Sequence, residues 1–218
     1  NFSFLSGYDL KKNFEHIILG SINFHQTNVE IENVRFNDIF SEDAINIFRS
    51  KFKIRNAKYN NIFSDAIDID FSEGKIIQTN FVNINNDAID FSGSKVDIKD
   101  AFFENVNDKI ISAGEDSKIN IYEITGTNSY AGIISKDGSE VYSQNVNFDE
   151  VKIPFAAYKK KKEYNFPLLN AKNYKLKNFS AKSVKDKTAK LFIDDETIVM
   201  KPDKIISLIY EKNFSLIE

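Results

Sequence analysis

Aspartate residues recur at a fixed spacing in the middle of the chain. Residues 64–72 read SDAIDIDFS, and residues 86–94 repeat this motif as NDAIDFSGS. Carboxylates about 5 Å apart repel by roughly 1 kcal/mol even in water, so such an alignment calls for an explanation. Aligning the repeats groups six carboxylates, which we call the acidic stripe: Asp43, Asp65, Asp68, Asp87, Asp90 and Asp108.

Three explanations fit the acidic stripe. First, the leading aspartates Asp43, Asp65, Asp87 and Asp108 accept backbone N–H bonds at a turn that repeats in every unit. Second, a hard cation such as Ca²⁺ is held by oxygens from successive units, with Asp68, Asp70 and Asp90 as its best ligands. Third, two of the carboxylates form a catalytic pair for glycoside chemistry, which needs a separation of roughly 5–9 Å.

Basic residues accompany the acidic stripe. Chemistry on uronic acids by a lyase or epimerase needs a base that removes the proton α to a carboxylate and a cation that neutralises that carboxylate. Lys109 or Lys136 is the candidate base and Arg49 the candidate cation. Arg55 would help the stripe carboxylates Asp65, Asp68, Asp87, Asp90 and Asp108 to bind the substrate. Solvated lysines on a polar surface are the simpler alternative.

Composition excludes several other functions. The chain has no cysteine, which removes disulfides, thiol catalysis and cysteine-bound zinc. Its two histidines, His16 and His25, lack metal-ligand spacing. The net charge of −3 gives no general support for a nucleic-acid partner. No apolar run reaches the roughly 20 residues that span a bilayer.

The elements that would position these residues recur with a period of about 22 residues, which indicates a solenoid. Three apolar anchors recur in each unit, and polar residues alternate with them over short runs, as in β-strands. The first anchors are Val29, Phe52, Gly74, Val96, Ile119 and Val141; the second are Phe36, Tyr59, Phe81, Phe103, Gly126 and Phe148; the third are Ile39, Ile62, Ile84, Val106, Ser129 and Val151.

Turn residues complete each unit. The fourth position after each first anchor is polar and suits left-handed backbone: Asn33, Asn56, Gln78, Asp100, Glu123 and Asn145. We therefore predict an all-β, single-stranded, right-handed parallel β-helix with coils of about 22 residues and terminal caps. Parity then directs Ile45, Ile67, Ile89 and Ile110 inward, and Asn46, Asp68, Asp90 and Ile111 outward.

The predicted organisation is one domain over residues 1–218. Residues 1–28 would form a leading coil or cap, residues 29–179 the repeating coils, and residues 180–218 a C-terminal cap over strand edges that would otherwise be unpaired. Residue 1 is Asn rather than Met, so we expect a processed piece of a longer parent chain with further domains as partners.

Several motifs, in this order, resemble a family of bacterial right-handed parallel β-helix proteins. They are SEDAINI (41–47), SDAIDIDFS, NDAIDFSGS, NDKIISAGEDS (107–117), GIISKDGSEV (132–141) and AAYKKKKEY (156–164). The resemblance covers roughly residues 20–175. It implies a cell-envelope or extracellular location, and the wider pectate-lyase-like fold includes polysaccharide lyases, alginate epimerases and polygalacturonases. The histidine motifs of the epimerases and polygalacturonases have no counterpart in this sequence.

The leading hypothesis is an extracellular or envelope domain that binds or helps to process a polysaccharide along the acidic stripe, with Ca²⁺ as a candidate ion. One alternative is an active polysaccharide lyase or C5-epimerase. Another is a structural spacer or adhesin module without catalysis.

Overall fold

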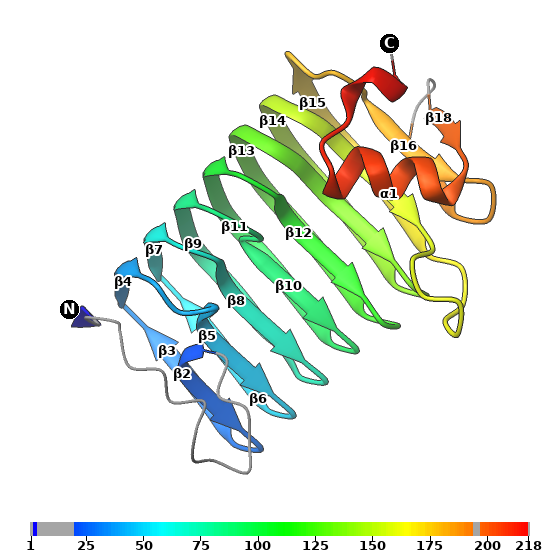
Figure 1. Ribbon diagram of the computed structural model, residues 1–218. Coiled ribbons are helices and arrows are strands. Elements are labelled where there is room, and N and C mark those ends of the chain that lie inside the picture. Colours follow the sequence, from blue (N-terminus) through cyan, green and yellow to red (C-terminus); the bar gives the residue numbers. More distant parts are fainter. Residues whose placement is uncertain (1, 4–19, 194–196, 218) are drawn as a thin grey trace.

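The computed structural model describes residues 2–3, 20–193 and 197–217 and shows a parallel β-helix of about eight coils (Figure 1). Every strand pairing among these residues is parallel, and each strand pairs with the equivalent strand of the neighbouring coil. The predicted fold is confirmed, and the coiling is consistent with a right-handed helix.

The strands follow the repeat in chain order. The N-terminal half contains β1 (Phe2–Ser3), β2 (Gly20–His25), β3 (Asn28–Glu32), β4 (Arg35–Ile39), β5 (Asp43–Phe48), β6 (Lys51–Arg55), β7 (Lys58–Ile62), β8 (Asp65–Asp70) and β9 (Glu73–Ile84). The C-terminal half contains β10 (Ile89–Ser92), β11 (Lys95–Val106), β12 (Lys109–Gly114), β13 (Lys118–Lys136), β14 (Glu140–Tyr158), β15 (Leu168–Lys177), β16 (Ser183–Asp186), β17 (Lys190–Phe192) and β18 (Thr197–Met200).

The core consists of stacked identical positions. All three predicted sets of anchors are in register between coils, for example Val29 beside Phe52 and Ile39 beside Ile62. The second set forms an aromatic stack in which the ring centroids of Phe36, Tyr59, Phe81 and Phe103 lie 4.8, 5.0 and 4.9 Å apart. Each buried side chain of this size contributes about 1.5–3 kcal/mol, so this stack is a main stabilising feature.

Left-handed residues make the corners of the coil. The predicted turn positions, from Asn33 to Asn145, all have φ between 50° and 60°. A second corner repeats the conformation at Asp38, Asn61, Asn83 and Asn105, where each amide donates to the side chain of the coil before it at 2.8–3.0 Å. Asparagine adopts this conformation at low cost and also supplies the amide for the ladder.

The stacked strands extend beyond residues 29–179. On the N-terminal side β2 pairs with β5; the remainder of the predicted leading cap lies largely outside the described residues. On the C-terminal side β16 and β17 pair with β14 and β15, and β18 pairs with β16.

The helix α1 (Pro202–Tyr210) follows β18 and packs on the outside of the coils (Figure 1). It buries Ile205, Leu208 and Ile209 against outward side chains such as Ile134 and Val184. A short 3₁₀ turn, η2 (Phe214–Leu216), follows it. No helix in the described chain is long and apolar enough to cross a bilayer.

Candidate functional site

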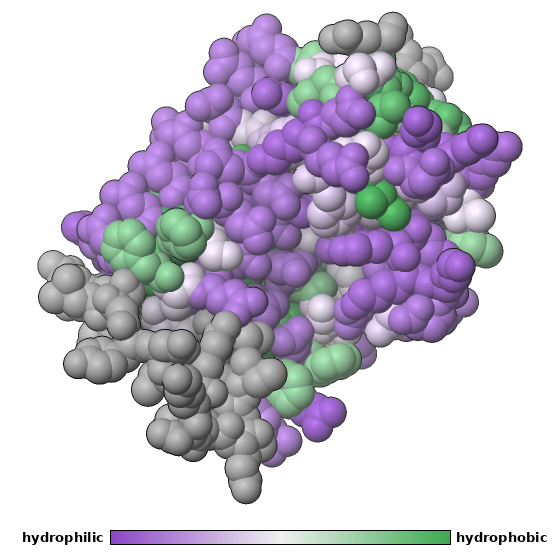
Figure 2. Space-filling view, in the orientation of Figure 1, coloured by the Kyte–Doolittle hydropathy of each residue, from purple (hydrophilic) through white to green (hydrophobic). Residues whose placement is uncertain are grey.

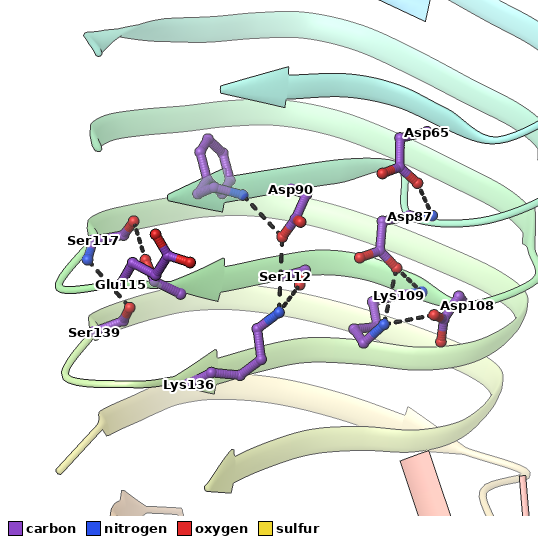
Figure 3. A network of polar contacts seen from close by, with 12 residues as sticks. Asp65, Asp87, Asp90, Asp108, Lys109, Ser112, Glu115, Ser117, Lys136 and Ser139 are labelled. Carbon is purple, nitrogen blue, oxygen red and sulfur yellow. Dashed lines mark hydrogen bonds and ion pairs between the residues drawn. The ribbon is translucent and has the colours of Figure 1, made fainter. Parts of the chain in front are cut away.

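One outer surface of the β-helix carries the acidic stripe. We call it the polar face; it is the outside of β5, β8, β10 and β12 together with the last residues of β13 and β14. Parallel register places Asn46, Asp68, Asp90 and Ser112 in one file along it. Figure 3 shows Asp65, Asp87, Asp90, Lys109 and Lys136 gathered on this face from successive coils.

The register corrects one predicted file. Ile89 lies beside Ile111 rather than Ile110, so Asp87 is followed by Lys109 in its file, not by Asp108. Asp108 instead follows Asn86, whose carbonyl accepts its N–H at 3.2 Å. Ile111, expected outside, is in the core, and Ser112 takes the outward place. The cause is local. The NDKII segment has two adjacent isoleucines, Ile110 and Ile111, and both are fully buried. The alternation of inward and outward residues therefore did not show which of the two aligns with Ile89.

Lys109 is buried between two carboxylates. Its Nζ lies 3.2 Å from Asp87 Oδ1 and 2.5 Å from Asp108 Oδ2, and its side chain is 3% exposed. Burial disfavours the ammonium, but Asp87 and Asp108 more than offset this, so the pKa of Lys109 is raised. A lysine that keeps its proton stabilises negative charge and does not remove protons. The geometry therefore favours Lys109 as a group that stabilises negative charge. Its role as the base that removes a proton stays a prediction.

Lys136, one coil further on, contacts one carboxylate and one hydroxyl group of the polar face. Its Nζ donates to Ser112 Oγ at 2.8 Å and lies 3.8 Å from Asp90 Oδ1. Burial again opposes the charge, and Asp90 is the main group that restores it, so the pKa of Lys136 is raised. The two lysines thus mark the C-terminal end of the acidic stripe with positive charge.

The N-terminal end of the stripe holds carboxyl groups that resist ionisation. Burial is the main cause, and neighbouring carboxylates add to it. The pKa of Asp43 is raised to about 7, that of Asp65 to about 8 and that of Asp68 to about 9. The pKa of Asp70 is raised for the same reasons. Part of this cluster is therefore protonated near neutral pH, so it can donate as well as accept hydrogen bonds.

Two aspartates of the stripe bind backbone as predicted, although they do so between coils. Asp65 Oδ1 accepts the N–H of Asp87 at 2.8 Å, and Asp87 Oδ1 accepts the N–H of Lys109 at 3.0 Å. Two other oxygens of the stripe, Asp43 Oδ2 and Asp108 Oδ1, are buried without a hydrogen-bond partner among the described residues. Buried polar atoms are normally paired, so each of these two oxygens carries an uncompensated desolvation cost.

The C-terminal helix forms a wall at the basic end of the polar face. The ring of Tyr210 lies 4.8 Å from Lys109 Nζ and 4.4 Å from Lys160 Nζ, and its hydroxyl is 3.1 Å from that of Tyr158. Lys161 pairs with Glu115 at the corner of the coil. Tyr210 was not among the predicted site residues, because its contacts join segments that no repeat relates.

Exposed phenyl rings border the polar face. Phe40 and Phe63 lie just before β5 and β8, and each is 60% exposed. Phe48 ends β5, and Phe71, 52% exposed, follows β8. Figure 2 shows two separate hydrophobic patches in the N-terminal half of the molecule, toward the lower left of the view, with hydrophilic surface between them. Phenylalanines were expected at core positions; their spacing by one repeat, outside the three anchor sets, is the sequence feature that marks these four.

The two arginines predicted for the site, Arg49 and Arg55, lie apart from each other. Arg49 follows β5 at the edge of the polar face, and its guanidinium carbon is 5.0 Å from the centre of the Phe48 ring. Arg55, predicted to bind substrate, ends β6 on a different face and pairs with Glu32 at 4.0 Å. The structure thus brings Lys109, Lys136 and the stripe carboxylates together, places Arg49 beside them and separates Arg55 from them.

The predicted Ca²⁺ ligands are neighbours but have protein partners. Asn46 Nδ2 donates to Asp68 Oδ2 at 2.9 Å, Lys136 pairs with Asp90, and Asp70 lies beside Ser92. Within the described residues no three acidic or histidine side chains are arranged to hold a metal ion. The residues present therefore do not fit a preformed calcium site.

The fold and this polar face define the chain as a parallel β-solenoid with a charged lateral surface. Comparison with protein-family models finds none that matches the chain. Comparison with curated proteins likewise finds no match.

Proposed function

We propose that the chain is a glycan-binding domain of an extracellular or envelope protein, with the polar face as its binding surface. The observation that carries this proposal is the register of Asp68 and Asp90, two partly exposed aspartates that lie side by side on successive coils of the polar face. A ligand that spans several coils could form hydrogen bonds to both side chains with successive hydroxyl groups.

The chemistry of the face suits a polyhydroxylated chain. Carboxylates accept hydrogen bonds from hydroxyl groups, and carboxyls that keep their protons, such as Asp68, can also donate them. The files repeat at the coil spacing of about 4.8 Å, so an extended polymer meets the same groups several times. Exposed rings at the border, such as Phe63, can cover the apolar faces of sugar rings.

Calorimetric titration against a panel of soluble glycans tests this proposal. The panel contains neutral glucans, amino-sugar oligomers and polyuronate oligomers, each with Ca²⁺ and with a chelator. The variant Asp68→Asn with Asp90→Asn should bind its best ligand at least about 10-fold more weakly, because it loses the carboxylate acceptor of Asp90, and a hydrogen bond to a charged group contributes about 1.5–3 kcal/mol. Failure of the wild-type chain to bind any member would contradict glycan binding and favour a spacer.

Asp97→Asn is the matched control. Asp97 is on β11, outside the polar face, and pairs with the exposed Lys75 at 3.7 Å while accepting from Asn120. Its replacement should leave glycan affinity unchanged. An affinity loss in the control equal to that of the double variant would show a general charge effect instead of a site.

A polysaccharide lyase or epimerase is the second candidate. It is supported by the pKa of Asp43 near 7 and that of Asp65 near 8, which suit acid–base work at neutral pH, in the same file as the protonated Lys109. Ultraviolet absorbance of unsaturated products would reveal a lyase, and NMR of treated polyuronates would reveal an epimerase. If the protein binds polyuronates but is inactive on all of them in both assays, the lyase and the epimerase are contradicted and the binding domain remains.

A further inference from the structure

A cleft lies at the corner of the coil, next to the end of the polar face. It has a volume of about 700 Å³ and is lined by side chains of the corners after β2, β5, β8 and β10, among them Arg49, Lys51, Phe71, Glu73 and Lys95. The two asparagine-rich corners described above carry only Asn, Asp, Gln and Glu at their left-handed positions from coil to coil. This corner instead places Arg49 and Phe71 at those positions.

Phe71 occupies a backbone position that does not favour it. Its φ is 49°, and the equivalent residues of the next coils are Gly93 and Glu115, with φ of 60° and 59°. A bulky side chain in left-handed backbone is uncommon and costs free energy, whereas glycine or asparagine fits there with little strain. Strain of this kind concentrates at functional positions.

The surroundings hold the Phe71 ring in place. A side chain at Gly93 would meet ring atoms of Phe71 at 2.6 and 2.8 Å, so the absence of a side chain there makes room for the ring. The Phe48 ring meets it edge to face, with centroids 5.9 Å apart, and the Arg49 guanidinium carbon is 6.0 Å from its centroid. The ring is nonetheless 52% exposed toward solvent.

The cleft has an excess of positive charge. Lys51 and Lys95 lie on either side of Glu73 in register, and Glu73 is the only acidic side chain among the described residues that line the cleft. Arg49 forms no ion pair with a carboxylate of the described chain, and its guanidinium lies against the two phenyl rings. A guanidinium next to an exposed ring is suited to a planar anion carried on an apolar ring.

We propose that this cleft is a subsite for an anionic sugar residue, with Phe71 against the face of the pyranose ring and Arg49 on its carboxylate. This inference rests on the proposed glycan-binding function and narrows its ligand to acidic glycans. The cleft takes the charged unit, and the adjoining polar face takes the hydroxyl groups of the units that follow.

Titrations with two probes test the subsite: a galacturonate hexamer and the same hexamer after reduction of its carboxylates to alcohols. Wild-type protein should bind the acidic hexamer at least about 10-fold more tightly than the reduced one. Arg49→Gln should remove this preference. Phe71→Asn should weaken both hexamers at least about 5-fold while the melting temperature stays equal or rises, because asparagine relieves the left-handed strain.

Phe192→Asn is the control, since Phe192 is equally exposed, at 53%, but is on β17 far along the coil axis. Equal affinity for both hexamers, no binding of either one, or unchanged binding by Phe71→Asn would overturn the subsite. If the subsite is overturned but the protein binds neutral or amino-sugar glycans of the panel, the proposed glycan-binding function still holds. A fall in melting temperature of Phe71→Asn would show that the ring has a structural role instead.

Discussion

Lys109 lies in the same file as Asp87, one coil further along the β-helix, with its Nζ 3.2 Å from Asp87 Oδ1 and the two side chains only 3% and 7% exposed. This contact divides the polar face into an acidic N-terminal part and a basic C-terminal part. A buried pair of this kind is weak support for stability as a whole, but removing one partner leaves an unpaired buried charge.

Removal of the Lys109 charge should therefore destabilise the fold strongly. Lys109→Met should lower the free energy of unfolding by about 3–5 kcal/mol, and adding Asp87→Asn should recover part of this loss. Urea denaturation measures both. Lys118→Met is the control, because Lys118 forms an exposed pair with Glu140 at 3.7 Å and should cost at most about 1 kcal/mol. Equal losses in the two single variants would contradict the buried pair.

The acidic stripe should make the fold less stable as pH rises. Asp43, Asp65 and Asp68 have raised pKa values of about 7, 8 and 9 in the folded chain. The folded state thus binds more protons than the unfolded state, whose aspartates titrate near pH 4. The stabilisation is full below about pH 4 and is lost as pH rises through the folded values. Urea midpoints should fall between pH 5 and pH 9.

Asp68→Asn tests the source of that pH dependence. Asparagine cannot ionise, so the variant should be more stable than the wild type at pH 9, by at least about 1 kcal/mol, and should show a flatter profile. The two proteins should differ least below about pH 4, where Asp68 is protonated in both the folded and the unfolded state. A wild-type midpoint that rises from pH 5 to pH 9 would contradict the raised pKa values.

The core should not accept a side chain at Gly126, which interrupts the aromatic stack between Phe103 and Phe148. A Cβ there would meet Ile110 Cδ1 at 2.6 Å and the Phe148 ring at 2.8 Å. Gly126→Ala should cost about 1–3 kcal/mol. Gly114→Ala is the control, since its nearest contacts, at 3.5 Å, are ordinary; thermal unfolding should separate the two variants clearly.

The asparagine ladder should contribute through both backbone and side chain. Asn83 has φ of 56°, donates to Asn61 at 2.9 Å and accepts from Asn105 at 2.8 Å. Asn83→Ala should cost about 2 kcal/mol, from left-handed strain of about 1–2 kcal/mol and from the lost bonds. Asn83→Gly relieves the strain alone and should lie between alanine and wild type in urea denaturation.

Periodicity in the sequence was sufficient to predict the fold. Aromatic residues recur at stacked positions such as Tyr59 and Phe81 because these positions have the same surroundings in each coil. Residues that tolerate left-handed backbone, such as Asn33 and Asn56, recur at the corner for the same reason. The predicted register was wrong at Asp108, where two consecutive isoleucines satisfied the pattern equally well.

The site was predictable in part, for a related reason. The stripe carboxylates, Lys109 and Lys136 could be predicted to lie on one surface from their positions in the repeat, although the place of Asp108 in its file could not. Tyr210 is on a helix without a repeat partner, and Phe71 is at a corner where residue type did not indicate the conformation. Both depend on contacts or backbone angles that spacing does not encode.

Amide hydrogen exchange with and without the tightest-binding glycan of the panel would locate the binding surface on the coils. We predict slower exchange on binding in β8, β10 and β12, the strands that carry Asp68, Asp90 and Lys109, and in the corners beside them. Exchange in the middle of β11, around Asp97, should not change. Protection confined to β11 or to the last strands, with none in β8, β10 and β12, would contradict a binding surface along the acidic stripe.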